Sequence, residues 1–452
     1  MNNTIFVQMA SYRDPFLVPT LVELIEHASN PQHLRIVICW QHALAETIGE
    51  FASRGFSKWR IRPAWPYAVH TLSYGAATIE LIDVAHDQSQ GACWARNMIQ
   101  QHYRNERYTL QLDSHHRFVH GWDILLVTML ESLRQTSPKP LLTTYLPPFS
   151  SFDEDISSLF PCPTVMTFDR FTPEGVVFFR SHPIQEWEGL SRPIPARFYS
   201  AHFAFADGHF AQSVQHDPQY FFHGEEISIA ARAFTHGYDL YHPHRIVAWH
   251  EYTRAGRPKM WDDHTDETRK DGTIAIPWWK RNEQSLLRNR ILFGMEQNTS
   301  ENIDLGPYGF GTERSLAQYE YYAGISFAHR GVQQATLDMT VAPGDIPSPS
   351  SESQWKDSLR RSNDIGISLH ESELGETSAL DACHLSARDG QGRTLHHKIL
   401  TGTKWLDHLR QDWINYRLIF TSTLDERPAD YVVELFDQTG ERFKRIEKAI
   451  SA

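Results

Sequence analysis

Cysteine is scarce in this sequence, and the few thiols are scattered. The 452 residues contain four cysteines, and no two of them form a Cys-x-x-Cys pair. The absence of paired spacing argues against a disulfide framework and favours buried thiols in a reducing compartment. Long apolar runs are also missing: no segment reaches about 18 apolar residues, and residues 1–10 lack a basic stretch followed by an apolar one. We therefore expect neither a membrane span nor a signal peptide, and a cytoplasmic protein.

Positive charge is also in short supply. The chain has 43 Lys and Arg against 55 Asp and Glu, a formal net charge of −12 with histidines neutral. Broad binding of nucleic acid or anionic lipid needs clustered cations, so the composition disfavours both partners. A cluster at Arg254, Arg257 and Lys259 leaves a local basic groove open. The 41% hydrophobic content and the length predict a sizeable core divided over two or three domains.

Strand and helix patterns alternate in the first part of the chain. Alternation of this kind is typical of a mostly parallel sheet covered by helices, in which ligands bind beyond the carboxyl ends of the strands. The turn at 11–14 and the motif Asp113-Ser114-His115 both follow expected strands, so both fall at that edge. The sequence predicts strands at 5–9, 34–40, 79–84 and 108–112, and helices at 15–25, 91–103 and 122–133.

The later part of the chain is less regular. Residues 137–189 read as long loops, 227–236 as a short helix and 238–249 as one strand-like run. Residues 343–376 are rich in Pro, Ser, Asp and Glu, which is typical of a linker or mobile loop. Strands are expected at 416–423 and 431–436, with a hairpin turn at 437–440. We therefore predict an α/β domain over residues 1–342, a linker or mobile loop over 343–378 and a small β-rich accessory domain over 379–452.

A carboxylate and an imidazole stand two residues apart after the fourth expected strand. Asp113 and His115 can both turn toward one divalent ion, which a pyrophosphate leaving group needs for charge neutralisation. The mixed oxygen and nitrogen donors favour manganese over magnesium. The adjacent His116 is expected to be a solvent-exposed neighbour. A third ligand has to come from a distant segment, where His250 follows a strand-like run and His242 and His244 stand on the same stretch as competing candidates.

These motifs, in this order, resemble those of two related families. Ala95-Arg96, then Asp-Ser-His, Gly121-Trp122 and a late histidine followed by Arg254 resemble the polypeptide N-acetylgalactosaminyltransferases. The closer resemblance is to the hydroxyproline N-acetylglucosaminyltransferases that modify a cytosolic F-box adaptor, and to their bacterial relatives. It spans roughly residues 4 to 330. The motifs that carry it are Phe6-Val7-Gln8-Met9-Ala10-Ser11-Tyr12-Arg13-Asp14, Ile38-Cys39-Trp40-Gln41, Gly91-Ala92-Cys93-Trp94-Ala95-Arg96, Gln111-Leu112-Asp113-Ser114-His115, Gly224-Glu225-Glu226 and Gly306-Pro307-Tyr308-Gly309.

The resemblance implies a GT-A fold, a Rossmann-like mixed sheet flanked by helices, over residues 1–342. It implies a metal site of Asp113, His115 and His250 for Mn²⁺ or Mg²⁺, with His242 and His244 as competing third ligands. The catalytic residues would be Glu225, Glu226 and Asp113, with the two glutamates facing the sugar or acceptor. Negative charge is also favoured at a helix N-terminus, so a structural role for this pair stays open. The residues implied to bind the UDP-sugar donor are Ser11, Tyr12, Arg13, Arg96, Ser114, His202 and Arg254.

The expected reaction is the retaining transfer of N-acetylglucosamine from UDP-N-acetylglucosamine to a hydroxyl group on a protein. One alternative acceptor is a hydroxylated nucleobase in DNA, which the acidic net charge disfavours without excluding a local groove. Another alternative is a catalytically inactive sugar-binding protein on the same fold, and the intact metal motif argues against it. The animal enzymes carry Glu-Asn where this chain has Glu225-Glu226, and their lectin-like C-terminal domain is not apparent. The acceptor and the oligomeric state therefore stay open.

Overall fold

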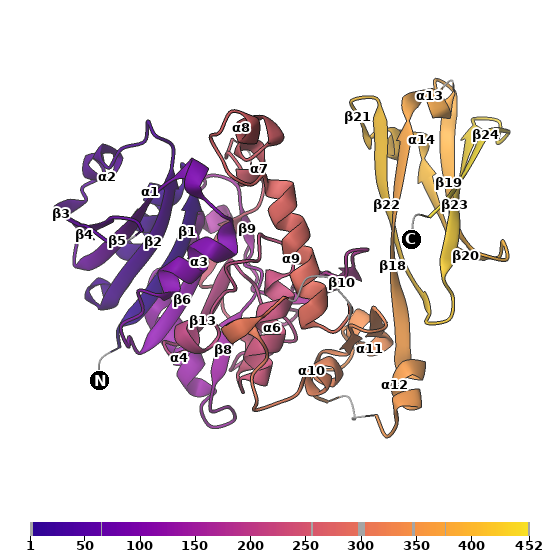
Figure 1. Ribbon diagram of the computed structural model, residues 1–452. Coiled ribbons are helices and arrows are strands. Elements are labelled where there is room, and N and C mark those ends of the chain that lie inside the picture. The colour runs from indigo at the N-terminus through magenta and orange to yellow at the C-terminus, as the bar shows by residue number, and fades with distance from the viewer. Residues whose placement is uncertain are drawn as a thin grey trace. The chain divides into compact units, whose positions relative to one another are not determined.

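The computed structural model describes residues 3–64, 66–254, 256–296, 303–345, 349–375 and 377–450. The chain divides into two compact units (Figure 1). Within the described residues, none of the helices combines the length and the apolar character needed to cross a bilayer. The first unit comprises Met1–Thr167, Phe179–Ala323 and Ala342–Asp345, and the second comprises Phe168–Phe178, Gly324–Val341 and Ile346–Ala452.

A ten-stranded mixed sheet forms the centre of the first unit. Its strand order is β12-β14-β8-β13-β6-β1-β2-β5-β4-β3. The four strands β5, β2, β1 and β6 run parallel, whereas β13 is antiparallel to both β6 and β8. The strands are β1 (Ile5–Tyr12), β2 (Leu34–His42), β3 (Ser57–Arg62), β4 (Val69–Tyr74), β5 (Ala77–Ala85), β6 (Tyr108–Asp113), β8 (Pro140–Thr143), β12 (Ile194–Pro195), β13 (Phe203–Asp207) and β14 (Asp239–His242).

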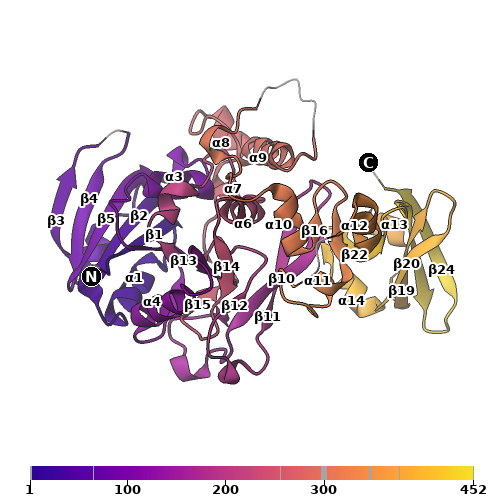
Figure 2. The same cartoon turned by 90° about the horizontal axis from the view of Figure 1, so that it is seen from below.

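Helices cover both faces of this sheet because successive strand residues point to opposite sides. Val7 and Met9 of β1 pack in one cluster with α1 (Leu17–Glu26) and α4 (Trp122–Ser132). Phe6 faces the other side, where it packs with α3 (Ala92–Gln100). Figure 2 shows α3 on one side of β1 and β2, with α1 and α4 on the other. Buried apolar side chains on both faces explain why these strands are nearly continuous apolar runs.

A small second sheet lies beside the carboxyl end of β6. It consists of β7 (His116–Phe118), β15 (Ala248–Glu251) and β9 (Pro148–Phe149), with β15 in the middle. The antiparallel pairing of β7 and β15 places His116 opposite His250. The remaining elements of this part of the chain are α2 (Gly49–Ser53), β10 (Thr164–Phe171), β11 (Val177–Pro183), α5 (Phe210–Ser213), α6 (Glu225–Thr235), α7 (Met260–Asp263), α8 (Asp266–Lys270), α9 (Trp278–Leu292) and α10 (Leu316–Ala323).

The second unit is built from two sheets that share one apolar core. Apolar residues such as Ile367 and Leu418 from one sheet pack with Leu385 and Val433 from the other. The first sheet has the order β16-β17-β18-β22-β21 and the second β20-β19-β23-β24. Their strands are β16 (Ile325–Ser326), β17 (Gly331–Gln333), β18 (Leu359–His370), β19 (Leu380–Asp389), β20 (Thr394–Thr401), β21 (Leu409–Arg410), β22 (Trp413–Thr423), β23 (Pro428–Asp437) and β24 (Arg442–Ala449). Short helices accompany them: α11 (Gln334–Leu337), α12 (Glu352–Ser358), α13 (Glu371–Leu374) and α14 (Gly402–Leu406).

The fold class expected from the sequence, a mixed α/β sheet flanked by helices with β-rich sheets toward the C-terminus, is confirmed. Three local expectations are wrong. The stretch 137–189 contains β8 to β11 in addition to loops, and the run 238–249 is two strands, β14 and β15, in different sheets. The stretch 343–378 contains α12 and β18, although its residues 346–348 and 376 lie outside the described ones. In β18, alternating apolar residues face the core, and this period-two pattern outweighs the Pro- and Ser-rich composition around it.

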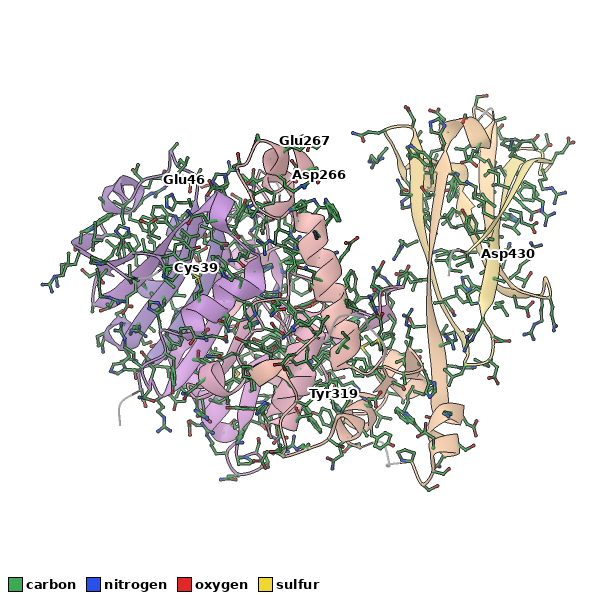
Figure 3. All side chains as sticks on the ribbon, in the orientation of Figure 1. Cys39, Glu46, Asp266, Glu267, Tyr319 and Asp430 are labelled. Atoms are coloured by element: carbon green, nitrogen blue, oxygen red, sulfur yellow. The ribbon has the colours of Figure 1, made fainter. Side chains whose placement is uncertain are left out.

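All four cysteines are free thiols. Cys39, Cys93 and Cys383 are buried, and Cys162 is partly exposed. Cys39 lies within β2, in the interior of the first unit (Figure 3), and its burial raises the pKa of its thiol. The scattered spacing predicts buried thiols, which is confirmed for Cys39, Cys93 and Cys383 and wrong for Cys162.

Candidate metal and donor site

Three side chains from two sheets converge beyond the carboxyl end of β6. Asp113 is the last residue of β6, His115 lies in the following turn, and His250 lies in β15. Oδ2 of Asp113 is 3.6 Å from Nε2 of His250 and 3.7 Å from Nε2 of His115. One potential ligand atom of each residue lies within 4.8 Å of the other two. The sequence predicted these three residues as a ligand set, and the fold brings them together.

The chemistry of this group fits a divalent ion. His250 is only 6% exposed, yet neither of its ring nitrogens has a hydrogen-bond partner. Its burial lowers its pKa well below the usual range, so the ring is neutral, which is the form that binds metals. Burial alone would raise the pKa of Asp113, but the guanidinium of Arg96 and the neighbouring histidines hold it well below its usual range. One carboxylate and two imidazoles suit Mn²⁺.

The two competing histidines, His242 and His244, do not join the group formed by Asp113, His115 and His250. Nδ1 of His242 is 2.8 Å from the carbonyl oxygen of Thr143, and Nε2 accepts the N–H of Met166 at 3.3 Å. Burial lowers the pKa of His242 to about 4. His244 belongs to neither of the potential metal-binding groups found among the described residues. The structure therefore favours His250 over both alternatives.

The expectation that His116 is solvent-exposed is wrong. Its side chain is fully buried, and its ring packs against those of His202 and His250. Its Nδ1 lies 3.1 Å from the carbonyl oxygen of Asp113, and its ring centre lies 4.9 Å from that of His250. His116 thus forms part of the wall behind the ligand group.

Asp14, in the turn after β1, holds the motif that follows β6. Its Oδ2 accepts hydrogen bonds from Oγ of Ser114 at 2.6 Å and Nδ1 of His115 at 2.7 Å. Burial would raise the pKa of Asp14, but His115, Ser114 and Arg257 together keep it below its usual range. The hydroxyl of Ser114, which was expected to bind the donor, donates to Asp14. The sequence placed Asp14 in a motif but assigned it no role.

Arg96 connects the ligand group to α6. Its Nη2 donates to Oδ1 of Asp113 at 2.7 Å, and its Nη1 lies 2.6 Å from both carboxylate oxygens of Glu225. Two glycines allow this approach. Gly91, before α3, has φ +121°, and Gly224, before α6, has φ +93°. A Cβ at Gly91 would lie 2.8 Å from the carbonyl oxygen of Phe221, so a side chain there would displace the helix that carries Arg96.

A second potential metal-binding group surrounds Glu225. The thiol of Cys93 donates to Oε2 of Glu225 at 2.7 Å, and Nδ1 of His216 lies 3.6 Å from the same oxygen. The two oxygens of Glu225 are already paired with the Arg96 guanidinium, so a cation here would lie beside a fixed positive charge. Burial raises the pKa of Cys93 well above its usual value and keeps it a neutral thiol. This group therefore does not fit a divalent ion, and it serves to anchor Arg96.

Glu226 and His202 both contact Tyr145, and His202 also stacks on the proposed ligand His250. Glu226 accepts hydrogen bonds from the hydroxyl of Tyr145 at 2.5 Å and the N–H of Ala201 at 2.9 Å. Its burial outweighs these bonds and raises its pKa to about 7. The ring of His202 stacks on that of His250 at 4.1 Å and also on Tyr145 at 5.2 Å. Glu226 is therefore a carboxylate that can exchange a proton near neutral pH.

The residues expected at the uridine and phosphate end occupy the turn after β1. The hydroxyl of Ser11 is buried and has no hydrogen-bond partner. The hydroxyl of Tyr12 donates to Asp263 at 2.7 Å, and Nη1 of Arg13 donates to the same carboxylate at 2.7 Å. Asp263 ends α7 and so ties this turn to the segment after His250. The sequence gave no signal for this long-range pair.

Arg254 is exposed and lies over two aromatic rings. Its guanidinium carbon is 5.3 Å from the ring centre of Phe222 and 5.7 Å from that of Trp261. Arg257, three residues later, is buried and pairs with Glu251. In the basic cluster noted in the sequence, Arg254 is thus exposed to solvent, whereas Arg257 forms a buried ion pair with Glu251.

Comparison with known proteins identifies the family. A family model described as glycosyltransferase (GlcNAc) matches residues 4–329. The chain belongs to this family. It is therefore a glycosyltransferase, and the finer resemblance to the hydroxyproline N-acetylglucosaminyltransferases stays a prediction. No curated protein matches the chain by sequence.

Several solved glycosyltransferase structures are similar to part of the chain. GalNAc-T7 with UDP, GalNAc and Mn²⁺ is 12% identical with a TM-score of 0.41, and the similarity covers 70% of this chain and 54% of that one. TarS of S. aureus is 8% identical with a TM-score of 0.33, covering 67% and 76%. The mannosyltransferase PcManGT from Pyrobaculum calidifontis, with GDP-Man and Mn²⁺, is 10% identical with a TM-score of 0.33, covering 65% and 76%. The TM-scores of these three structures are all below 0.5.

Proposed function

We propose that the protein transfers N-acetylglucosamine from UDP-N-acetylglucosamine to a hydroxyl group on a protein, with retention of the anomeric configuration. Membership of the glycosyltransferase (GlcNAc) family supports the class of reaction. The observation that carries the proposal is the convergence of Asp113, His115 and His250 at the end of β6, beside the Arg96–Glu225 pair. We propose that these three residues hold Mn²⁺ or Mg²⁺.

The donor would bind along the edge where β1 and β6 end. A divalent ion held there neutralises the two phosphates and stabilises UDP as the leaving group. Ser11 offers an unpaired buried hydroxyl, and Tyr12 and Arg13 are held in place by Asp263. Arg254, which is exposed and lies over Phe222 and Trp261, would meet a phosphate. Arg96 keeps Asp113 ionised and oriented, so it supports donor binding through its neighbour.

The sugar and the acceptor would lie toward His202 and Glu226. Retention does not require an enzyme nucleophile, because the leaving phosphate can accept the proton of the attacking hydroxyl on the same face of the sugar. The protein then contributes alignment and fixed charges. Glu226, with its pKa raised to about 7, and Tyr145, which donates to it, are the groups that would bind hydroxyls of the sugar or acceptor.

A donor screen that measures nucleotide release tests this proposal. UDP-N-acetylglucosamine should be the best substrate among common nucleotide sugars, Mn²⁺ the best ion, and excess chelator should abolish release. Asp113→Ala should lose nearly all transfer while staying folded. Asp207→Ala is the matched control, since Asp207 also ends a strand of the same sheet and pairs with an arginine, Arg134. Undiminished turnover in chelator would refute the metal requirement.

The acceptor is tested separately with peptides and oligonucleotides. Peptides that carry serine, threonine or hydroxyproline should accept the sugar, and NMR of the product should show the anomeric configuration of the donor. Glu225→Gln, which loosens the Arg96 that holds Asp113, should reduce transfer by about tenfold or more, equivalent to about 1.4 kcal/mol in the barrier. Transfer to a hydroxylated base in DNA without transfer to any peptide would overturn the protein acceptor.

A further inference from the structure

Asp14 is the side chain that joins the segments carrying the proposed ligands. It follows β1 and its side chain is only 4% exposed. Its Oδ2 accepts hydrogen bonds from Nδ1 of His115 and from Oγ of Ser114. Both donors lie in the turn directly after Asp113. One buried carboxylate oxygen therefore fixes this turn at two points.

The same carboxylate is connected to the segment that carries His250. Nη1 of Arg257 lies 3.4 Å from Oδ2 of Asp14. Nη2 of Arg257 donates to Oε2 of Glu251 at 2.5 Å, and Glu251 directly follows His250 in β15. The chain Asp14–Arg257–Glu251 thus links the two ligand-bearing segments through buried ion pairs. Buried pairs of this kind fix geometry when every member has a partner.

The hydrogen bond from His115 determines which ring nitrogen is free. An ionised carboxylate only accepts hydrogen bonds, so Nδ1 of His115 must carry the proton when it pairs with Asp14. In the neutral ring Nε2 then keeps its lone pair, and this atom is the one that lies 3.7 Å from Oδ2 of Asp113. Histidines that bind metals commonly donate their other N–H to a carboxylate in this way. Loss of that partner typically reduces metal affinity by about 10- to 100-fold.

We propose that Asp14 is a positioning residue for the metal site, which sets the tautomer and orientation of His115. This inference rests on the proposed metal site and adds to it a residue that does not touch the ion. Asp14 acts through His115, so its loss weakens ion binding without removing a ligand. The consequence is a change in the Mn²⁺ concentration that the enzyme needs, in contrast to a loss of the chemical step.

Mn²⁺ binding to the full chain in the presence of UDP tests the proposal. The free Mn²⁺ signal in electron paramagnetic resonance gives the Kd. Asp14→Asn keeps the volume and removes the charge, and we expect its Kd to rise by about 10- to 100-fold. Its turnover should return at saturating Mn²⁺, with a raised KM for the ion and a retained kcat. A residue with a merely structural role would lose stability without this rescue.

Asp123→Asn is the matched control. Asp123 is also a buried carboxylate, and it accepts the backbone N–H groups of Ser29 at 2.8 Å and Asn30 at 2.9 Å. Asp123 lies in the first turn of α4 and holds the loop at residues 29–30. It contacts none of the proposed ligands. Asp123→Asn should lower stability and leave Mn²⁺ affinity unchanged.

His115→Ala separates failure of this inference from failure of the proposed function. Weaker Mn²⁺ binding in both His115→Ala and Asp14→Asn, with an unchanged control, supports the positioning role. Weaker binding in His115→Ala alone overturns the role of Asp14 and keeps the metal site. Unchanged binding in His115→Ala shows that the metal site itself is wrong, and the role of Asp14 falls with it.

A measurement on the unaltered protein covers the case in which Asp14→Asn does not fold. The metal-free protein is labelled with ¹⁵N histidine, and the His115 signals are assigned by their loss in His115→Ala. A proton on Nδ1 with a free Nε2 supports the proposal. At a pH where the ring is neutral, a proton on Nε2 with none on Nδ1 overturns it, because Asp14 would then not set the tautomer that leaves Nε2 free for an ion.

Discussion

Nη2 of Arg96 lies 2.7 Å from Oδ1 of Asp113, which leaves Oδ2 of the same carboxylate facing His115 and His250. Arg96 is 4% exposed and pairs with Glu225 through its other amino group. One arginine therefore neutralises the buried Glu225 and the partly exposed Asp113, and it selects which oxygen of Asp113 faces the proposed ion. A single ammonium group offers no planar fork, so lysine cannot replace it.

Replacement of Arg96 by alanine should destabilise the fold strongly. It leaves the buried Glu225 without a counter-charge, and breaking a buried pair in this way costs about 3 to 5 kcal/mol. Chemical denaturation measures the loss. Arg269→Ala is the control, since the Arg269–Asp266 pair is nearly half exposed on both sides and should contribute less than about 1 kcal/mol. Equal effects of the two changes would contradict the bridging role.

Replacement of His250 by leucine should separate stability from metal binding. Both ring nitrogens of His250 are buried without hydrogen bonds, and each unmet group costs about 1 to 3 kcal/mol. In chelator, His250→Leu should therefore be at least as stable as the parent protein. With UDP and Mn²⁺ at about 100 times Kd, only the parent should gain about 2.7 kcal/mol.

Thermal unfolding with and without the ligands checks this prediction. His242→Leu is the comparison, because both nitrogens of His242 have partners. That change should lower stability and leave the gain from Mn²⁺ and UDP intact. If UDP and Mn²⁺ stabilise His250→Leu as much as the parent, the third ligand is a residue other than His250.

Glu226 should make stability depend on pH. Its pKa is raised from 4.5 to about 7 in the folded state, so the folded chain binds this proton more tightly than the unfolded chain does. The stability that the proton provides is present below about pH 4.5 and is lost as pH rises through about 7, to a total of about 3 kcal/mol. Glu226→Gln resembles the protonated form and should remove that loss.

Denaturant unfolding of the parent and Glu226→Gln at acidic and mildly alkaline pH measures the difference. The free energy of unfolding of the variant should rise relative to that of the parent as pH rises. The two values should converge at low pH. The exposed Glu188→Gln should follow the parent at every pH. A constant difference across the range would show that Glu226 keeps its ordinary pKa.

Local patterns carried much of the information about this protein. Asp113 and His115 are recognisable from their spacing after an apolar strand, and the parallel strands β1, β2, β5 and β6 follow from continuous apolar runs. His250 needed the order of the motifs, because no local pattern distinguishes one histidine among 25. The strands β3 and β4 were missed because their short segments carry no long apolar run.

The residues that the sequence could not supply are those defined by distant contacts. Asp14 and His115 are 101 positions apart, and Tyr12 and Asp263 are 251 apart. His116 reads as a polar neighbour of His115 and becomes buried only because β7 pairs with β15. Proximity of this kind is a property of the assembled sheet, so neither periodicity nor spacing reveals it.

The central claim is that Asp113, His115 and His250 together bind a divalent ion with the donor nucleotide. Crystals grown with UDP and Mn²⁺, and diffraction data collected at the manganese absorption edge, test it most directly. We predict one strong anomalous peak about 2.0 to 2.3 Å from Oδ2 of Asp113 and Nε2 of each histidine. No peak at this position while UDP is bound, or a peak ligated by other residues, would contradict the account.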